Sequence, residues 1–379
     1  MLPFNKPYFV GTETSYIQEA VRSGKISGDG MFTRRCEAWF EQQLGAARAL
    51  LTTSCTDALE LAALLLDLQP GDEVLLPSFT FSSTANAFVL RGARLVFVDC
   101  APDSPALDAA TLEALVTPRT RAIVPVHYAG TACDMDMVLA VAVRHQLAVV
   151  EDAAQAISSE YRGRPLGTLG TLGTFSFHET KNITAGGEGG LLVINDEQLV
   201  ARAEILREKG TNRVAFFRGE VDKYSWVDVG SSFLPADINA AFLWAQMEQL
   251  NFIQERRCAI WWRYQTSLQR LADLGVELPV VPEYATLNGH LFYLVCRSLS
   301  ERTALIVHLK ARGIAAIFHY QPLHRSPYYA ARHDGRPMPR TDRYADCLVR
   351  LPLYVELEEA EQARIVREVL TFYGIALSS

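Results

Sequence analysis

The chain has 379 residues, of which 49% are hydrophobic and 21% are charged, so it is long enough to bury a large core and to form two domains. Its formal net charge is -7 and its Lys and Arg residues form no long run, which argues against a nucleic-acid partner and against binding to an anionic membrane. Seven scattered cysteines without a CxxC pair argue against a disulfide framework and against a zinc site.

The N-terminal stretch "MLPFNKPYFVGTE" has no basic segment followed by an apolar one, and apolar runs such as "LAALLL" are too short to span a bilayer. We therefore expect neither a signal peptide nor a membrane span. The sequence predicts a cytoplasmic protein with reduced cysteines and no metal site.

From about residue 48 to residue 209, short apolar runs alternate with helical stretches. The expected strands, in chain order, are "ARALLTT", "DEVLLPS", "RLVFVDC", "RAIVPVHYAG", "LAVVEDAA", "GTFSFHE" and "GGLLVIND". Such alternation is typical of an α/β fold in which helices cover both faces of a mostly parallel sheet. The runs carry few charges, as expected for strands that are buried on both sides.

A second region follows residues 236–271, which show a long helical pattern without internal Gly or Pro. Beyond it, "HLFYLVCRS", "TALIVHLKARG", "IAAIFHYQ" and "EEAEQARIVREVLTFYG" predict a smaller α+β domain, and "PYYAARHDGRPMPRTDRY" predicts a flexible polar loop. We divide the chain into a large domain over residues 1–250, the N-terminal segment included, and a small C-terminal domain over residues 251–379.

Polar residues at the predicted strand ends are the first candidates for a site, because ligands of open α/β sheets bind at the carboxyl ends of the strands. These positions hold Ser54-Cys55-Thr56, Ser78 to Phe81, Asp99, His127-Tyr128, Asp152 with Gln155, and Ser176 to Lys181. Such a set can bind and activate an aromatic phosphate.

The phosphate of such a ligand suits "TTSCTDA", where small hydroxyl and thiol residues stand at a strand-to-helix turn with free backbone N–H groups. The same pattern is more often an ordinary helix N-cap. In "VVEDAAQA", strand alternation sends Glu151 and Asp152 to opposite faces, so that one of them can face the site. A carboxylate there would keep a pyridine nitrogen protonated and make the ring an electron sink; the competing interpretation is a carboxylate that caps the next helix.

In "SFHETKNITAGGEGG", Lys181 stands where a buried strand should end and the chain should turn. An amine beside an aldehyde-bearing cofactor forms a Schiff base and later moves protons. The glycines at 186, 187, 189 and 190 would let backbone approach a ligand closely. A surface lysine in a turn is the common alternative, but the conjunction of phosphate turn, acid, hydroxyl and lysine at strand ends favours the cofactor.

The segments "EDAAQA", "GTFSFHETKNITAGGEGG", "ADINAA", "PVHYAG" and "FHYQPLH" closely resemble the DegT/DnrJ/EryC1/StrS sugar-nucleotide aminotransferases, and the resemblance covers essentially the whole chain. It implies the aspartate-aminotransferase type fold, which is fold type I of the enzymes that use pyridoxal 5′-phosphate (PLP). This fold has a three-layer αβα large domain with a mostly parallel sheet and a smaller C-terminal α+β domain. The resemblance also implies a homodimer with shared active sites.

Carried over by position, the resemblance implies that Lys181 holds PLP covalently and acts as acid and base. Asp152 would pair with the pyridinium nitrogen, and Gln155 would bond the ring hydroxyl. Further contacts to the phosphate and to the ring face would come from Cys55, Thr56, Ser176 and Phe81.

The substrates that the resemblance implies are a sugar nucleotide and L-glutamate. We expect contacts to the sugar nucleotide from Arg213, Tyr224, His319 and Tyr320. One departure is Leu234, which stands where many relatives have an asparagine that reaches the cofactor phosphate of the neighbouring subunit. Ser231 or Ser232 would have to replace that contact.

The implied reaction moves an amino group from L-glutamate to the C4 ketone of a nucleotide-linked 4-keto-6-deoxysugar in two half-reactions. Another dTDP- or UDP-ketosugar, a PLP-dependent sugar dehydratase and a non-enzymatic regulator are the alternatives. Dehydratases on this fold have histidine where Lys181 stands, and a regulator would be expected to lose the lysine or the acid, so both are disfavoured. A nicotinamide dehydrogenase is disfavoured because "GDGMFT" lacks the third glycine of a GxGxxG motif.

Overall fold

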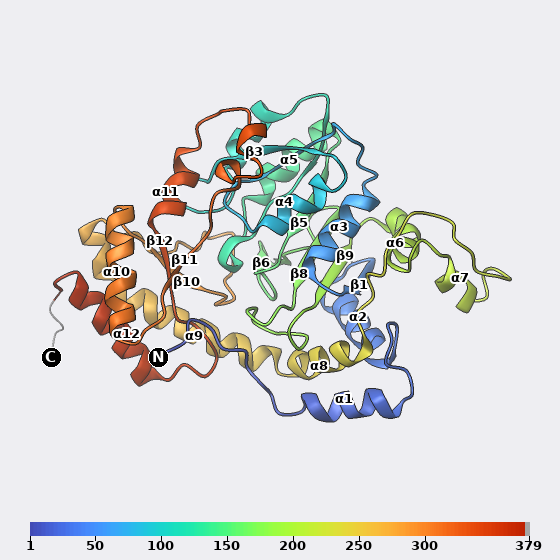
Figure 1. Cartoon of the computed structure of the whole chain (residues 1–379), viewed down its shortest axis with the longest axis horizontal. Coiled ribbons are helices and arrows are strands. Elements are labelled where there is room, and N and C mark those ends of the chain that lie inside the picture. The colour runs from blue at the N-terminus through green and yellow to red at the C-terminus, as the bar shows by residue number, and fades with distance from the viewer. Residues whose placement is uncertain (376–379) are drawn as a thin grey trace.

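The computed structural model describes residues 1–375, in which a large sheet and a small sheet organise most of the chain (Figure 1). Within these residues the large sheet has seven strands: β1 (Arg48–Thr52), β2 (Glu73–Pro77), β3 (Arg94–Val98), β4 (Thr120–Ile123), β5 (Ala148–Asp152), β8 (Leu172–Ser176) and β9 (Gly190–Ile194). Their spatial order is β1-β9-β8-β5-β4-β2-β3. The strands from β8 to β3 in this order run parallel, whereas β9 is antiparallel to both of its neighbours.

Helices cover both faces of the large sheet, which gives three layers. One face carries α2 (Met31–Leu44), α5 (Met135–His145) and α8 (Asp237–Glu248), with α1 (Glu13–Arg22) packed on α8. The other face carries α3 (Cys55–Leu65), α4 (Ser82–Val89) and α6 (Val200–Arg207). Successive strand residues alternate between the two faces: Leu191 and Val193 enter the first core, and Leu192 enters the second. The predicted α/β class and mostly parallel sheet are confirmed.

The small sheet is antiparallel, with the order β10-β12-β11. It comprises β10 (Phe292–Val295), β11 (Ile317–Phe318) and β12 (Leu348–Leu351), and it packs with α9 (Leu250–Leu268), α10 (Leu299–Ala311) and α12 (Glu359–Phe372). The start of the chain joins this unit, since Leu2 forms a bridge with Ile314 and is buried in the same core. In Figure 1 the N-terminus accordingly lies beside α9 and α12. The division at residue 250 stays a prediction, and residues 376–379 lie outside the described part.

The long helical pattern is confirmed with one interruption, and the expectation of a flexible polar loop is wrong. Residues 236–271 do not form one helix, because the chain leaves helical geometry at Gln249 (φ -110°, ψ 13°) between α8 and α9. The polar stretch from residue 327 to residue 344 is packed on the large sheet rather than free. Its buried Tyr329 hydroxyl accepts the N–H of Leu95 (2.7 Å), and α11 (Pro339–Cys347) begins within it.

Shorter elements complete the described chain: β6 (Glu160–Tyr161), β7 (Arg164–Pro165), α7 (Arg213–Phe217), and short 3-10 helices at Ala109–Leu115, Tyr128–Gly130, Glu197–Leu199, Gln269–Leu274, Leu323–Arg325 and Ala330–Arg332. None of the helices in residues 1–375 combines the length and the apolar character that a membrane crossing requires. The same residues contain no cluster of three or more His, Cys, Asp or Glu side chains that could hold a metal ion.

Candidate active site

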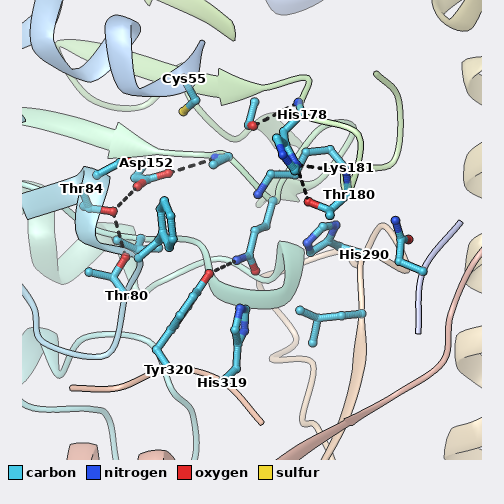
Figure 2. Close-up of a pocket in the computed structure, with 18 of the residues that line it drawn as sticks. Cys55, Thr80, Thr84, Asp152, His178, Thr180, Lys181, His290, His319 and Tyr320 are labelled. Atoms are coloured by element: carbon cyan, nitrogen blue, oxygen red, sulfur yellow. Dashed lines mark hydrogen bonds between the residues drawn. The ribbon is translucent and has the colours of Figure 1, made fainter. Parts of the chain in front are cut away.

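A cavity of about 550 Å³ opens where the carboxyl ends of the large sheet's strands face the small sheet. The predicted site residues that line it are Cys55, Thr56, Phe81, Asp152, Gln155, Ser176, Lys181, His319 and Tyr320. The structure therefore brings together residues that stand up to 265 positions apart, from Cys55 to Tyr320. Figure 2 shows how the polar groups of both sheets converge on this space.

One corner of the cavity is the N-terminus of α3. The Ser54 hydroxyl caps the helix by accepting the N–H of Asp57 (3.1 Å). The N–H groups of Cys55 and Thr56 follow it in the first turn, where no intrahelical acceptor exists. The hydroxyl of Thr56 donates to that of Ser83 (2.8 Å), which lines the cavity too. The N-cap interpretation is confirmed at Ser54, and the donors after it suit a phosphate, as the other interpretation expects.

Two of the glycines after Lys181, Gly189 and Gly190, allow protein to pack closely on protein. A Cβ at Gly190 would lie 2.3 Å from the carbonyl carbon of Ser54, so only glycine lets β9 pass this close to the α3 turn. A Cβ at Gly189 would lie 2.6 Å from the Cβ of Ala185. Our expectation that these glycines admit a ligand is wrong at Gly190, where the close neighbour is the backbone of the turn itself.

The carboxylate of Asp152 ends β5 and is buried at the wall of the cavity. Its Oδ2 accepts the hydroxyl of Thr84 (2.7 Å), which is 2.9 Å from the hydroxyl of Thr80, and its Oδ1 accepts the N–H of Ala154 (3.1 Å). These bonds, drawn in Figure 2, fix the orientation of the carboxylate from two elements. An acid held in this way can stabilise a cationic nitrogen on a bound ring.

The neighbouring Glu151 points to the other face of the sheet, as strand alternation predicts. It is fully buried and accepts the N–H groups of Gly167 (2.8 Å) and Gly170 (2.7 Å). The Nε2 of His127 lies 2.9 Å from Glu151, while the Nδ1 accepts the N–H of Cys133, so Nε2 carries the proton that binds the carboxylate. His127 is therefore part of the core and not of the cavity.

A second strand-end residue also has a structural task. Asp99 does not line the cavity; its Oδ1 accepts the N–H of Thr341 (2.7 Å) and so anchors the start of α11. Position at a strand end is thus insufficient to predict a ligand contact, because returning chain segments compete for the same polar groups.

Lys181 follows β8 at the centre of the cavity, and in Figure 2 it lies between Asp152 and His290. The backbone turns at this point, with the N–H of Lys181 bonded to the carbonyl oxygen of His178 (2.9 Å). Burial lowers the pKa of the Lys181 amine, against the opposing influence of Cys55 and Asp152. A lysine with a lowered pKa is a better nucleophile at neutral pH and can carry protons.

The aromatic side of the cavity is formed by Phe81 and Tyr320, whose ring centres are 6.3 Å apart. The Tyr320 hydroxyl accepts the amide of Gln155 (3.1 Å), and the Oε1 of Gln155 accepts the N–H of Ala129 (2.7 Å). His319 is bonded through Nδ1 to the hydroxyl of Tyr128 (3.1 Å). Flat apolar surface, an acid, an amine and phosphate donors are the groups that PLP requires, so the residues present fit this cofactor.

Arg213 and Tyr224 lie outside this cavity. Arg213 lines a second cavity of about 340 Å³, and its Nη1 is 3.4 Å from Glu208. Tyr224 is half exposed and packs against Phe216. The structure of one chain therefore does not bring these two predicted substrate contacts to Lys181.

Sequence reasoning missed several residues of the cavity wall. Thr84 and His290 carry no pattern of their own, because a threonine in a helix and a histidine in a loop are common. Arg350 had a signal: in "LVRLPLY" it interrupts an apolar strand. The predicted list of strand ends excluded it because it belongs to the small sheet.

The fold and the cavity define a PLP enzyme of fold type I, in which a lysine and an aspartate meet at the carboxyl edge of a mostly parallel sheet. The model of the DegT/DnrJ/EryC1/StrS aminotransferase family matches residues 8–370. The chain belongs to this family and is a PLP-dependent aminotransferase of the sugar-modifying kind.

Solved structures agree with this assignment over the whole length. The chain is similar to the aminotransferase TlmJ from Streptoalloteichus hindustanus, with 30% identity, 99% of each chain covered and a TM-score of 0.90. It is similar to DesV of S. venezuelae, with 33% identity, 100% of this chain and 99% of that chain covered, and a TM-score of 0.89. Spr1654 from Streptococcus pneumoniae, in its PLP-form, has 27% identity, 99% coverage of both chains and a TM-score of 0.90.

Proposed function

We propose that the enzyme transfers an amino group from L-glutamate to the C4 ketone of a nucleotide-linked 4-keto-6-deoxysugar. The substrate we infer is dTDP-4-dehydro-6-deoxy-D-glucose, and the product is dTDP-4-amino-4,6-dideoxy-D-galactose. The stretches "SFHETKN" and "EKGTNR" with "FFRG" and "DKY" support this choice, because they resemble the dTDP-4-amino-4,6-dideoxygalactose transaminase. That enzyme acts in the synthesis of bacterial surface polysaccharides such as enterobacterial common antigen.

The observation that carries the proposal is the Lys181 amine, whose pKa is lowered by burial, in one cavity with the Asp152 carboxylate. PLP, when bound, supplies an aldehyde that condenses with amines and a ring that accepts electrons. Lys181 would hold it and, once displaced by the donor, would move a proton from the donor's α-carbon. Asp152, held by Thr84 and Ala154, would keep the ring nitrogen protonated.

The remaining predicted residues would position the cofactor. The N–H groups of Cys55 and Thr56, with the Ser176 hydroxyl, would hold the phosphate, and Phe81 would cover one ring face. The second amide hydrogen of Gln155 is free for the ring hydroxyl, because its first bonds Tyr320. His319 and Tyr320 would contact the sugar nucleotide from the small sheet.

A substrate panel tests the proposal. Purified enzyme with PLP and L-glutamate would be incubated with dTDP- and UDP-linked 3-keto and 4-keto sugars, and the amine product would be measured by mass. We expect the highest kcat/KM with the dTDP-linked 4-keto-6-deoxysugar. If the enzyme prefers another ketosugar at the same concentration of L-glutamate, the proposed substrate is wrong but the proposed reaction class stands.

We also propose a homodimer with shared active sites. Exposed aromatic side chains crowd the segment around α7: Phe217 is 71% exposed, Tyr224 is 53% exposed and Trp226 is 81% exposed. In Figure 1 this segment projects from the body of the molecule. If a neighbouring chain covers this segment, Arg213 and Tyr224 of this chain would lie beside the active-site cavity of the neighbouring chain.

The cross-subunit phosphate contact belongs to the same proposal. The side chain of Leu234 cannot donate a hydrogen bond, and Leu234 lines the second cavity with Ser232 and Arg213. We propose that Ser232 supplies the contact that asparagine makes in many relatives. Seven free cysteines support a further proposal that the enzyme works in the reducing cytoplasm.

A further inference from the structure

His290 lines the active-site cavity just before β10, and its ring lies beside Lys181 in Figure 2. The residue is only 8% exposed. Its Nδ1 is 2.8 Å from Oδ1 of Asn182, the residue that follows Lys181 in the chain. This contact holds the imidazole at the wall next to the lysine and leaves Nε2 as the ring nitrogen without a protein partner within residues 1–375.

The surrounding amides decide which nitrogen of His290 carries the proton. Nδ2 of Asn182 lies 2.9 Å from the backbone carbonyl oxygen of Asn288 and 2.8 Å from Oε1 of Gln254. The amide nitrogen of Gln254 in turn lies 2.9 Å from the carbonyl oxygen of Ile157. A carbonyl oxygen only accepts, so both amides must turn their nitrogens toward these carbonyl groups. Oδ1 of Asn182 therefore faces His290 as an acceptor, and Nδ1 of His290 must be the protonated nitrogen.

The imidazole of His290 has no second proton. Burial lowers the pKa of His290 well below its ordinary value, and the charges of Lys181, Arg257 and Arg350 lower it further. At neutral pH the ring is thus neutral, and its Nε2 is an acceptor that cannot donate. A buried acceptor without a donor is costly, which points to a hydrogen that a ligand brings into the cavity.

Few groups of the proposed ligands can supply that hydrogen. The phosphate of PLP and the carboxylates of an amino acid only accept, and the PLP ring nitrogen is proposed to meet Asp152, on the other side of Lys181 in Figure 2. A ketosugar, in contrast, carries a hydroxyl on a carbon next to its ketone. Because the ketone carbon must approach Lys181 to receive a proton, this hydroxyl comes close to the wall that holds His290.

We propose that Nε2 of His290 accepts a hydrogen bond from the sugar hydroxyl next to the ketone. The proposal rests on the function proposed above and narrows the substrate to ketosugars with a free hydroxyl at that carbon, which is C3 in a 4-keto-6-deoxysugar. The bond would fix the orientation of the sugar ring, so that one face of the ketone carbon meets Nζ of Lys181. An acceptor that cannot donate would also select against sugars whose oxygen at this carbon is acylated, because such an oxygen has no hydrogen to offer.

The test follows the two half-reactions separately, through the cofactor absorption at about 410 to 430 nm. L-Glutamate is mixed with the PLP-loaded enzyme, and a ketosugar is mixed with the enzyme that holds the aminated cofactor. The two sugars are the ketosugar that reacts best in the substrate panel and its analogue with hydrogen in place of the hydroxyl next to the ketone. The dependence of the rate on sugar concentration gives the dissociation constant of each sugar.

Three variants remove or keep the acceptor. His290→Asn retains an amide that can donate to Asn182 but has no atom at the position of Nε2, whereas His290→Gln places an amide oxygen near that position. His290→Phe keeps a ring without an acceptor and decides the test if His290→Asn does not fold. The control variant is His145→Asn, which removes a histidine at the end of α5 that pairs with Glu113 outside the cavity.

In the wild type, the analogue should bind about 10-fold more weakly than the hydroxylated sugar, because one buried hydrogen bond is lost. His290→Asn should weaken the hydroxylated sugar about 10-fold and should change the analogue and the L-glutamate half-reaction by less than about 2-fold. His290→Gln should restore part of the difference between the two sugars, and His145→Asn should behave as wild type.

Other results would overturn the proposal. Equal slowing of both half-reactions in His290→Asn would assign the acceptor to the amine of Lys181 or of the cofactor. A preference for the hydroxylated sugar that persists in His290→Asn would place the hydroxyl against another residue, and equal binding of both sugars to the wild type would show that the hydroxyl is not bound. Failure of the proposed function appears earlier and differently: no ketosugar of the panel would react although L-glutamate is consumed, and the hydroxyl contact would then fall with it.

Discussion

At the scale of single residues, the first prediction concerns the proposed role of Lys181 as the cofactor's attachment point. The PLP-loaded enzyme should be yellow, with absorption at about 410 to 430 nm, and borohydride should fix the cofactor on Lys181. Lys181→Ala should lower turnover at least about 1,000-fold, because both anchor and base are lost. Peptide mass mapping checks the position. A reduced adduct on a different lysine would remove the centre of the proposed mechanism.

The lowered pKa of Lys181 leads to a pH-dependent prediction for the cofactor-free protein. Between this lowered pKa and the ordinary value of about 10.4, the unfolded chain binds more protons, so stability rises with pH. The stability that deprotonation of Lys181 contributes is fully present above about pH 10.4. It is lost as the pH falls through the lowered pKa that Lys181 has in the folded protein.

Lys181→Met should therefore make the cofactor-free protein more stable near pH 7, and this advantage should shrink toward pH 10. Urea unfolding at several pH values would measure it. The matched control is Lys310→Met, which removes an exposed lysine of α10. A pH-independent difference in the Lys181 variant would contradict the interpretation.

Asp152 provides the second residue-scale test. Asp152→Asn keeps the size of the side chain and its bond from Thr84 but cannot stabilise a positive ring nitrogen. We expect kcat to fall by about 100-fold or more with little change in the midpoint of unfolding. Turnover near the wild-type level would show that the ring nitrogen has another partner.

At the scale of elements, the α3 N-terminus places the capping residue Ser54 two positions before Thr56, for which we propose a binding role. Ser54 caps the helix, so Ser54→Ala should cost about 1 kcal/mol of unfolding free energy. Thr56 faces Ser83 at the cavity, so Thr56→Val should leave stability nearly unchanged and should weaken the retention of PLP. Chemical denaturation and cofactor dialysis measure the two effects. Interchanged effects would mean that the cap and the phosphate donor are assigned to the wrong residues.

At the scale of the whole molecule, the shared-site proposal predicts complementation between two inactive variants. Lys181→Ala chains and Arg213→Gln chains would be mixed and allowed to exchange subunits. Half of the dimers would be hybrids with one intact site of two, so activity should recover to about one quarter of wild type. Hybrids would be verified with different affinity tags. Verified hybrids without activity would show that each site belongs to a single chain.

The sequence by itself determined the alternating strands and helices, the family, and the placement of Lys181, Asp152, Ser176 and the α3 turn in one site. These follow from local periodicity and from motifs that are continuous in the chain, since parallel strands carry their ends to one edge. Tertiary structure alone decided which strand-end groups face the cavity. Asp99 bonds the start of α11 and His127 bonds Glu151, because buried polar groups bond the nearest partner. It also decided that Arg350, from a strand of the other sheet, completes the wall, since no local pattern encodes the packing of distant elements.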